Sequence, residues 1–405
     1  MIDKKLYNHN DTAIIILAAG KGTRMKSDLP KVMHKIAGKA MIERVIETAC
    51  GLSVGHISVV INQQMLELQD FFASVIQNYT EQQNISRPVY ELFTQEQQLG
   101  TAHAVRAALD ASNNIANYKK ILVLYGDTAL LKIDTLSTLL NKLDDDNNGC
   151  VIGFYPDNPG KYGRLIIDGQ QNIGNESQKI GETQYIDNKE GAKILEIIEY
   201  KDATDQQRAI TLCNSGVMGF NIKSLLENIN KITNDNASGE YYLTDMVKLI
   251  NSVKKSCAYI IASEAELLGI NSKVDLAKAE YEYQQILRYQ AMHEYGVTML
   301  DPATIYLSDN IEFGKNVVIE PNVQIKGTTK IADNVHIKSF SYIENAIIGE
   351  AVSIGPFARI RPDSVIQSNV NIGNFVEIKN SIIADGVKIN HLSYIGDRVD
   401  QAFTQ

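Results

Sequence analysis

The sequence predicts an α/β protein that begins with a domain built around a mostly parallel β-sheet and ends in a parallel β-helix. Three observations lead to this expectation. Short apolar runs alternate with longer amphipathic stretches over roughly the first 250 residues, and isoleucine recurs about every six residues near the end. Between the two regions lies one long, uninterrupted helical pattern. Strand–helix alternation favours a sheet covered on both faces, whereas a six-residue apolar period is typical of β-helical coils.

The sheet of the first region is predicted from its apolar segments. Near-continuous apolar runs predict buried strands at residues 12–17, 56–61, 120–125 and 150–155. Amphipathic patterns predict helices over residues 41–50 and 101–111. Ligands of such sheets bind at the carboxyl ends of the strands, so functional residues are expected directly after the apolar runs.

The long helical pattern covers residues 272–295 and contains neither proline nor glycine. Ser272 is suited to cap its beginning, and Gly296 to end it. We interpret this segment as a helix that joins two domains, with an ordinary helix of the first domain as the alternative. The predicted boundaries are 1–252 for the first domain, 253–302 for the connecting segment and 303–405 for the β-helix.

Isoleucine marks the repeats of the last region. It occupies positions 319, 325, 331, 337, 343, 348, 354, 360, 366, 372, 378, 383, 389 and 395. One strand per hexad produces coils of roughly 18 residues, with each isoleucine pointing into the core, so these positions span about four coils. Coils cannot bury their own ends, so stacking, capping or self-association is expected.

The amino-acid composition limits which binding partners and which cellular compartment are expected for this chain. The chain has 405 residues, 44% of them hydrophobic and 21% charged, with a net charge of −9. This charge argues against nucleic acid or an anionic membrane as a partner. The four cysteines fit no C-x-x-C pattern, and we expect neither a disulfide framework nor a zinc site. No apolar run is long enough to span a membrane, the N-terminus resembles no signal peptide, and a cytoplasmic location is expected.

The stretch "IIILAAGKGTRM" (14–25) has the features of a phosphate-facing turn. Gly20 and Gly22 directly follow the first predicted strand, where glycine lets backbone N–H groups approach an anion closely. Arg24 offers a bidentate guanidinium and Lys31 a compact positive charge. The spacing matches neither G-x-x-x-x-G-K-[ST] nor G-x-G-x-x-G, and a structural turn remains the alternative for the glycines.

Eight ordered motifs carry a family resemblance. They read "LAAGKGTRMKSDLPKVMHKIAGKAM" (17–41), "TQEQQLGTAHAV" (94–105), "LYGD" (124–127), "KYGRLI" (161–166), "EYKDAT" (199–204), "CNSGVMGF" (213–220), "GEYYLTD" (239–245) and "LGINSKVDL" (268–276). The chain resembles sugar nucleotidyltransferases, and most closely the bacterial family of bifunctional N-acetylglucosamine-1-phosphate uridyltransferase/glucosamine-1-phosphate acetyltransferases. The resemblance implies a Rossmann-like nucleotidyltransferase domain followed by a left-handed β-helix. It also implies UTP and N-acetylglucosamine 1-phosphate as substrates, UDP-N-acetylglucosamine and pyrophosphate as products, and a role in cell-wall synthesis.

The resemblance assigns roles to individual residues. The uracil nucleotide would be contacted by Ala19, Gly20, Gln95, Gln98 and Gly100. The sugar phosphate would be positioned by Thr101, Gly163, Glu199 and Asn214, with Tyr125 shaping the floor. Arg24 and Lys31 would act on the triphosphate, and Asp127 and Asn271 would bind Mg²⁺. Several of these residues also have a purely structural alternative. Asp127 could be a turn residue, and Asn271 could start a helix. Glu199 could be half of a surface ion pair, and both glutamines could be loop residues.

These roles are chemically consistent with transfer of a nucleotidyl group. Attack of a sugar phosphate on an α-phosphorus gathers negative charges, so catalysis consists mainly of positioning and charge neutralisation. Mg²⁺ prefers oxygen ligands and retains water, so one carboxylate, one amide oxygen and substrate phosphates suffice. Asp127 follows an apolar strand, where such folds place functional side chains.

A second predicted site lies in the β-helix. "GPFARIRPDS" (355–364), "GNFVEIKNS" (373–381) and "INHLSYIGD" (389–397) resemble the family's acetyltransferase motifs. They imply His391 as the general base and Arg361, Lys379 and Tyr394 as ligands of glucosamine 1-phosphate, with acetyl-CoA as co-substrate if the site is functional. A turn residue is the alternative for His391. The resemblance also implies a homotrimer formed through the β-helix.

The hexad pattern stops at Ile395, and the tail "RVDQAFTQ" (398–405) does not continue it. From this departure we expect intact uridyl transfer and weak or absent acetyl transfer by this chain. Two other functions are open at this point. One is an ADP-glucose or GDP-mannose type of nucleotidyltransferase, which base selectivity would distinguish. The other is a non-catalytic assembly subunit of the same architecture, which should lack Arg24, Lys31, Asp127 or Asn271.

Overall fold

The computed structural model describes residues 7–168 and 193–397 and divides the chain into two compact units. Unit 1 comprises Met1–His34 and Ala40–Leu276, and unit 2 comprises Lys35–Lys39 and Ala277–Gln405. This division differs from the predicted boundaries at residues 252 and 302. Residues 256–261 fall within the predicted connecting segment. They form strand β11 (Ser256–Ile261), which belongs to the unit 1 sheet because it pairs in parallel with β7 (Asn147–Phe154).

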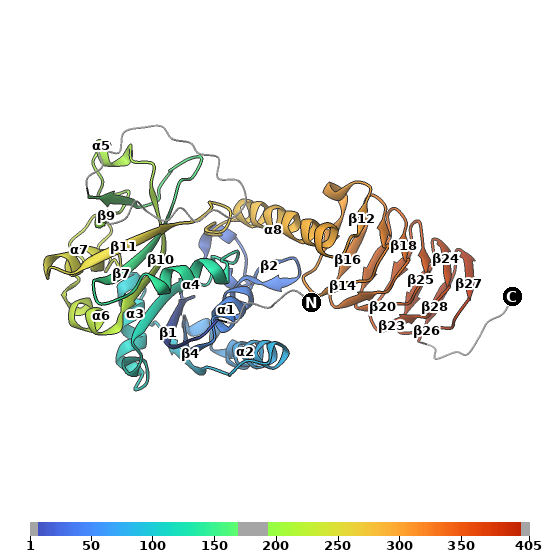
Figure 1. Ribbon diagram of the computed structural model, residues 1–405, viewed down its shortest axis with the longest axis horizontal. Helices are drawn as coiled ribbons and strands as arrows, with labels where there is room; N and C mark the ends of the chain where they lie inside the picture. Colours follow the sequence, from blue (N-terminus) through green and yellow to red (C-terminus); the bar gives the residue numbers. More distant parts are fainter. Residues whose placement is uncertain (1–6, 169–192, 398–405) are drawn as a thin grey trace. The chain divides into compact units, whose positions relative to one another are not determined.

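Unit 1 contains a mixed sheet that is mostly parallel (Figure 1). Over the described residues it has nine strands, in the order β11-β7-β10-β6-β1-β4-β5, with β8 beside β10 and β9 beside β8. The remaining strands are β1 (His9–Leu17), β4 (Val54–Ile61), β5 (Val89–Thr94), β6 (Lys120–Tyr125), β8 (Arg164–Ile167), β9 (Ile194–Ile198) and β10 (Cys213–Asn221). β10 runs antiparallel to both β6 and β7, whereas β1 pairs in parallel with β4 and β6. The strands predicted at 12–17, 56–61, 120–125 and 150–155 correspond to β1, β4, β6 and β7.

Helices cover both faces of this sheet, as the apolar strands predicted. The helices of unit 1 are α1 (Met41–Gly51), α2 (Gln69–Gln83), α3 (Thr101–Ala111), α4 (Ile133–Asn141), α5 (Asp205–Arg208), α6 (Ile222–Asn228) and α7 (Asp245–Ser252). Successive residues of β1 point to opposite faces, so Ile14 and Ile16 belong to one apolar core and Ile15 to the other. Helices α1, α2 and α4 contribute to the first core, and α3, α6 and α7 to the second.

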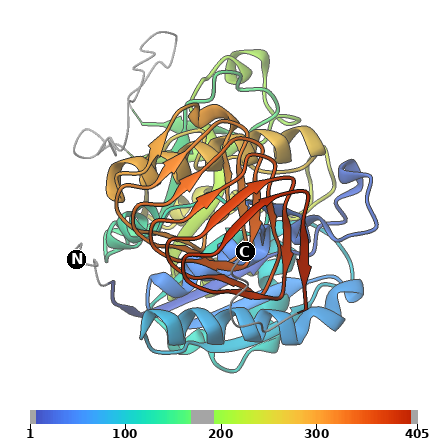
Figure 2. The same cartoon turned by 90° about the vertical axis from the view of Figure 1, so that its right-hand side faces the viewer.

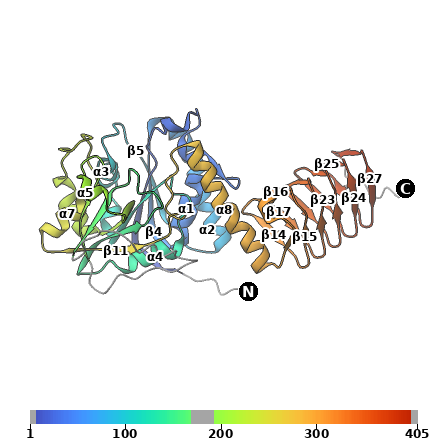
Figure 3. The same ribbon diagram turned by 90° about the horizontal axis from the view of Figure 1, so that it is seen from above.

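Unit 2 is a parallel β-helix whose strands form three sheets. Within the described residues, the first sheet contains β12 (Thr298–Met299), β15 (Val318–Ile319), β18 (His336–Ile337), β21 (Ser353–Ile354), β24 (Asn371–Asn374) and β27 (Lys388–His391). The second contains β13 (Tyr306–Leu307), β16 (Gln324–Lys326), β19 (Tyr342–Glu344), β22 (Arg359–Ile360), β25 (Glu377–Lys379) and β28 (Tyr394–Gly396). The third contains β14 (Ile311–Phe313), β17 (Thr329–Ile331), β20 (Ala346–Ile348), β23 (Ser364–Ile366) and β26 (Ile382–Ile383). Figure 2 shows the successive coils nearly superimposed, and Figure 3 shows their strands side by side.

The predicted isoleucines form the core of these coils. Those from Ile319 to Ile389 are buried, and Ile395 is partly buried. The isoleucine pattern did not mark the coil before Ile319, because Met299 and Leu307 occupy the positions where later coils have isoleucine. Turns between strands place residues such as Phe340, Phe357 and Phe375 at positive φ, and their exposed rings stack with centroids 5.0 and 5.2 Å apart.

The long helix α8 (Lys273–Glu294) matches the predicted span, and the boundary between the units falls within it. Its start is capped reciprocally. The Asp275 backbone N–H donates to Ser272 Oγ at 3.2 Å, and Asp275 Oδ2 accepts from the Ser272 N–H at 2.8 Å. Gly296, two residues beyond its end, has a φ of +69°, which glycine adopts without strain.

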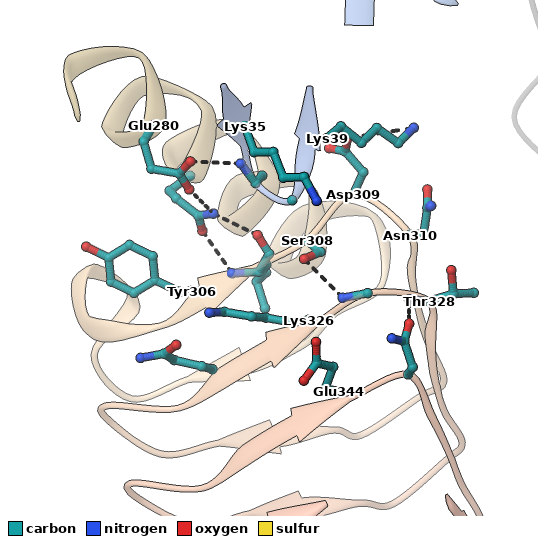
Figure 4. A pocket seen from close by; sticks show the side chains of 17 residues that line it. Lys35, Lys39, Glu280, Tyr306, Ser308, Asp309, Asn310, Lys326, Thr328 and Glu344 are labelled. Carbon is teal, nitrogen blue, oxygen red and sulfur yellow. Dashed lines mark hydrogen bonds and ion pairs between the residues drawn. The ribbon is translucent and has the colours of Figure 1, made fainter. Parts of the chain in front are cut away.

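Unit 2 includes a hairpin from early in the chain, formed by β2 (Lys35–Ile36) and β3 (Lys39–Ala40). The Ala37 N–H donates to Glu280 Oε2 at 2.8 Å, and Lys39 pairs with Asp309 at 3.8 Å. A cavity of about 620 Å³ lies between this hairpin, α8 and the first coils (Figure 4). Its lining carries charges of both signs, from Lys35, Lys39 and Lys326 and from Glu280, Asp309 and Glu344.

Among the described helices, none is both long and apolar enough to cross a membrane. All four cysteines are buried and unpaired, as expected for a chain without a disulfide framework. Burial raises the pKa of the Cys50 thiol to about 12, so this side chain stays protonated at neutral pH.

Candidate active site

The phosphate-facing turn and Asp127 lie at the same edge of the sheet. Strands β1 and β6 are parallel neighbours that end opposite each other at Leu17 and Tyr125. The Gly126 N–H donates to the Leu17 carbonyl at 2.9 Å, so the two connections leave the sheet side by side. Because parallel strands share one carboxyl edge, the loop after β1 and the Asp127 side chain face the same space.

Lys31, Asp127 and Asn271 come together although 240 residues separate the first from the last. The Lys31 ammonium forms a short ion pair with Asp127 Oδ2 and donates to Asn271 Oδ1 at 3.2 Å. The side chains of Lys31 and Asp127 are only 13% and 14% exposed. One cation therefore sits between the two oxygens that the sequence assigns to a metal.

Two hydrogen bonds to backbone carbonyls fix this arrangement. The Ile270 N–H donates to the Asp127 carbonyl at 3.1 Å, which ties the two ligand segments together. The Asn271 Nδ2 donates to the Gly269 carbonyl at 3.2 Å, so the amide oxygen is turned toward Lys31. The oxygens of Asp127 and Asn271 thus converge on the Lys31 ammonium.

Gly22 is required beside Lys31 for a steric reason. Its φ of +62° is left-handed, and a Cβ there would lie 2.6 Å from Lys31 Cβ. The loop then forms the short helix η1 (Thr23–Met25), which buries Met25 and leaves Arg24 exposed. Within residues 7–168 and 193–397, Arg24 makes no hydrogen bond or ion pair, so the structure does not join it to Lys31. A space for a Cβ is open at Gly20.

The residues predicted for the nucleotide surround the same loop. The Ala19 carbonyl accepts hydrogen bonds from the side-chain amides of Gln98 and, at 3.4 Å, of Asn62. The Gln95 amide donates to the Gly100 carbonyl at 3.3 Å and contacts His103 Nδ1 at 3.1 Å. These contacts hold the side chains of both glutamines, of which Gln95 is buried and Gln98 is an exposed loop residue.

Gly100 permits a close backbone crossing. It has a φ of +116°, and a Cβ there would lie 2.5 Å from the Tyr241 carbonyl oxygen. The Ala102 N–H donates to the Tyr241 carbonyl at 2.9 Å, and the Tyr241 N–H donates to the Leu99 carbonyl at 2.8 Å. The "QLGTAHA" and "GEYYLTD" motifs are therefore one structural element of the site.

The residues predicted for the sugar phosphate form a connected group around Tyr125. Tyr125 is hydrogen-bonded with Thr101, and the Thr101 Oγ1 accepts from the Leu243 N–H at 2.9 Å. A Cβ on Gly163 would lie 3.4 Å from Glu199 Oε2. The Asn214 N–H donates to the Gly163 carbonyl at 2.9 Å, which completes the group.

The acidic groups of this cluster are electrostatically perturbed. Burial raises the pKa of Glu199 above its usual value, and only the hydrogen bond from Thr244 Oγ1, at 3.3 Å, opposes this. Burial likewise raises the pKa of Tyr125, with the charges of Glu199 and Asp127 adding to the effect. Extra negative charge is therefore costly here unless cations accompany it.

Sequence reasoning missed two residues that support the site. Asp275 Oδ2 accepts from the Asn271 N–H at 3.0 Å as well as from Ser272, so it positions Asn271. The S-x-x-D spacing of Ser272 and Asp275 could have indicated it. Gly216, with a φ of +89°, lets the backbone approach the Tyr125 ring, where a Cβ would lie 2.8 Å away. No sequence signal marked it beyond its place in "CNSGVMGF".

The candidate residues of the β-helix lie on neighbouring coils. Arg361 pairs with Glu377 at 3.0 Å and Lys379 with Asp397 at 3.3 Å, whereas Tyr394 is aligned with Glu377 in the adjacent strand. His391 ends β27 in another sheet, where it is exposed and aligned with Asn374. The tail at 398–405, on which the expectation about acetyl transfer depended, lies outside the described residues. That expectation stays a prediction.

Family comparisons agree with both units. A model of the MobA-like NTP transferase domain matches residues 14–174, and the bacterial transferase hexapeptide model (six repeats) matches residues 310–345 and 345–380. Among solved structures, a UDP-glucose pyrophosphorylase complexed with UDP-glucose has 17% identity and a TM-score of 0.48, covering 68% of this chain and 99% of that chain.

Two curated relatives match nearly the whole chain, and both are called bifunctional protein GlmU. The relative from Zymomonas mobilis subsp. mobilis is 39% identical over 96% of this chain and 79% of its own length. The relative from Nitrobacter hamburgensis is 41% identical over 95% of this chain and 77% of its own length. The predicted family is therefore confirmed: the chain belongs to the GlmU family of bifunctional proteins.

Proposed function

We propose that this chain transfers the uridylyl group of UTP to N-acetylglucosamine 1-phosphate, giving UDP-N-acetylglucosamine and pyrophosphate. The observation that carries the proposal is the convergence of Lys31, Asp127 and Asn271 beside the glycine-rich loop. Their side chains come from three distant segments and meet at the carboxyl edge of the sheet, where such folds bind nucleotides. Family membership supplies the identity of the reaction.

The residues near Ala19 serve the nucleotide in this proposal. The Ala19 carbonyl, Gly20 and the amides of Gln95 and Gln98 offer hydrogen-bonding groups of both kinds, which suits the edge of a uracil ring. Gly100 keeps the neighbouring backbone close enough to complete this wall. Arg24 is exposed next to the loop, so its flexible side chain can turn toward a triphosphate.

The group around Tyr125 receives the sugar phosphate. Thr101, Glu199 and Asn214 present hydroxyl, carboxylate and amide groups, which together can bind the hydroxyl and acetamido groups of an amino sugar. Gly163 leaves room beside Glu199 for the ring. The half-buried Glu199 disfavours a second unpaired anion nearby, so the acceptor phosphate must lie on the side of Lys31.

The donor set fits Mg²⁺, because a carboxylate oxygen and an amide oxygen already converge on one cation, the Lys31 ammonium. Among the described residues no group of three or more His, Cys, Asp or Glu side chains could hold a metal ion. Because of this convergence, we propose that Asp127 and Asn271 hold Mg²⁺ together with substrate phosphates and water. When bound, the ion neutralises charge on the phosphates.

The chain's own residues then act by positioning. Arg24 and Lys31 pair with the phosphates of UTP and offset the charge on the pyrophosphate as it leaves. The residues around Tyr125 hold the amino sugar so that its phosphate lies in line with the α-phosphorus, which lowers the entropic cost of the encounter. No covalent intermediate with the protein is needed, since the sugar phosphate oxygen is itself the nucleophile.

The β-helix has a proposed role of its own. In the family's acetyl transfer, Arg361, Lys379 and Tyr394 would bind glucosamine 1-phosphate, and His391 would take the proton from its amine during transfer from acetyl-CoA. We still expect this transfer to be weak or absent in this chain. Its coils would associate into a homotrimer, and the enzyme would act in the cytoplasm. These assignments rest on family membership and on the placement of Arg361, Lys379 and Tyr394 on successive coils, at or next to strands of one sheet.

A nucleotide selection assay tests the main proposal. Purified chain, Mg²⁺ and N-acetylglucosamine 1-phosphate are incubated with UTP, ATP, GTP or dTTP, and pyrophosphate release is measured. We expect UTP to be preferred, and Asp127→Asn to lower kcat by about 10²-fold or more, in the range known for losing a charged stabilising group. The matched control is Asp110→Asn, an exposed carboxylate on α3. A preference for ATP or GTP, or full activity of Asp127→Asn, would refute the proposal.

A further inference from the structure

Lys31 occupies the position where the proposed metal ion would bind. Its ammonium contacts both Asp127 Oδ2 and Asn271 Oδ1, and nearly nine-tenths of the Lys31 and Asp127 side chains are shielded from solvent. The Lys31 ammonium therefore neutralises the Asp127 carboxylate and also binds the Asn271 amide oxygen. An ammonium and a divalent ion cannot both lie between the same two oxygens, because they repel each other and need the same lone pairs.

The two oxygens are held in place independently of Lys31. Asp275 accepts hydrogen bonds from the backbone N–H groups of Asn271 and Ser272, and the Asn271 amide is oriented by the Gly269 carbonyl. Asp127 is tied to the same segment through the Ile270 N–H. When the cation changes, these ligands need not move, so only the lysine side chain has to rearrange.

Lysine is suited to such an exchange. Its charge lies at the end of a flexible four-carbon stem, whereas arginine holds a carboxylate in a rigid bidentate fork. The backbone of Lys31 is fixed in the short helix η2 (Lys31–Met33) and packed against Gly22. Rotation of the side chain about this fixed base moves the ammonium away from Asp127 while it remains beside the glycine-rich loop.

We infer that the Lys31 ammonium is the resident cation of the metal-free site and competes with the divalent ion for Asp127 and Asn271. This inference rests on the proposed function, which assigns the metal to these two residues. Lys31 keeps the largely buried Asp127 carboxylate paired before metal binds, because an unpaired charge there would be costly. It leaves the two oxygens when metal enters with the triphosphate, and its charge then becomes available to the phosphates. The chain consequently binds divalent ions weakly until nucleotide is present.

The test measures Mn²⁺ binding to the nucleotide-free chain by electron paramagnetic resonance. Lys31→Met removes the charge but keeps the length of the side chain, and Lys31→Gln provides a second neutral variant. We expect both to bind Mn²⁺ about tenfold more tightly than the unmodified chain, within the usual range of coupling between two ligands. Lys21→Met is the matched control, because it removes an exposed charge from the same loop and should change the affinity less than twofold.

Asp127→Asn, alone and combined with Lys31→Met, separates this inference from the proposed metal site. Loss of Mn²⁺ binding in both Asp127 variants, with tighter binding in Lys31→Met and Lys31→Gln, supports the competition. If both neutral variants bind Mn²⁺ no better than the unmodified chain while Asp127→Asn still loses it, the metal site stands and the competition is refuted. If Asp127→Asn leaves Mn²⁺ binding unchanged, the proposed metal site and the competition both fail. Thermal melting of every variant confirms that it is folded.

Discussion

The two candidate sites are built in opposite ways. In unit 1, Lys31, Asp127 and Asn271 come from distant segments and meet as a half-buried cluster held by tertiary hydrogen bonds. In unit 2, Lys379 and Tyr394 stand on the neighbouring strands β25 and β28, and Arg361 directly follows β22, so the three lie about one coil apart in sequence. Their ion pairs, Arg361–Glu377 and Lys379–Asp397, also join successive coils.

This difference shows where each site gets its precision. A repeat places side chains in register through the regular core beneath them, so the outer residues need few contacts of their own. A site assembled from distant segments has no such register and depends on individual contacts, such as the backbone crossing at Gly100. Core substitutions should therefore disturb the β-helix most, and single close contacts should matter most in unit 1.

The largest expected effect is in the core of the β-helix. Ile360 is fully buried between Ile343 and Ile378 of the adjacent coils, so Ile360→Ala should lower the free energy of unfolding of unit 2 by about 2–5 kcal/mol. Urea unfolding of the whole chain, followed by hydrogen exchange of peptides from 298–397, measures this. Ile347→Ala is the matched control, because Ile347 lies on β20 in another sheet of the same β-helix and is 50% exposed. Equal losses in the two variants would mean that core burial does not set the register.

A smaller but more local effect is expected at Gly100. The added methyl of Gly100→Ala would collide with the Tyr241 backbone and displace the "QLGTAHA" segment from the site. We expect kcat/KM for UTP to fall by about tenfold or more, because a shift of about 1 Å is costly for a positioned substrate. Gly296→Ala, which also has positive φ but open space around it, is the control for backbone strain. If both variants retain activity, close packing at Gly100 is not what positions the nucleotide.

Regular features of the chain were predictable from sequence, whereas contacts between distant segments were not. The strands, the helix over 272–295 and the isoleucine register follow from local apolar periods and caps, which act over a few residues. Asp127 could be placed at a strand end for the same reason. That Lys31 pairs with both Asp127 and Asn271 depends on packing across the sheet, which no local pattern encodes. The coil before Ile319 was missed because Met299 and Leu307 fill core positions without repeating the isoleucine signal.

The smallest expected effect concerns the charge of Glu199. It tests whether the buried carboxylate of this candidate site lowers the stability of unit 1. Burial raises the pKa of this carboxyl above 4.5, its value in an unfolded chain. The folded state then binds the proton more tightly than the unfolded state, so stability is greatest below about pH 4.5 and declines as the pH rises through the folded-state value. Glu199→Gln cannot lose a proton and still offers an oxygen to Thr244. The variant should therefore melt close to the unmodified chain at pH 4.5 and about 2 °C higher at pH 8, as calorimetry can measure.

Glu227→Gln, which changes an exposed residue of α6, is the control and should show no such pH-dependent difference. A variant that is less stable at pH 8 would show that the charged form of Glu199 is held by favourable contacts and not at a cost to the stability of unit 1.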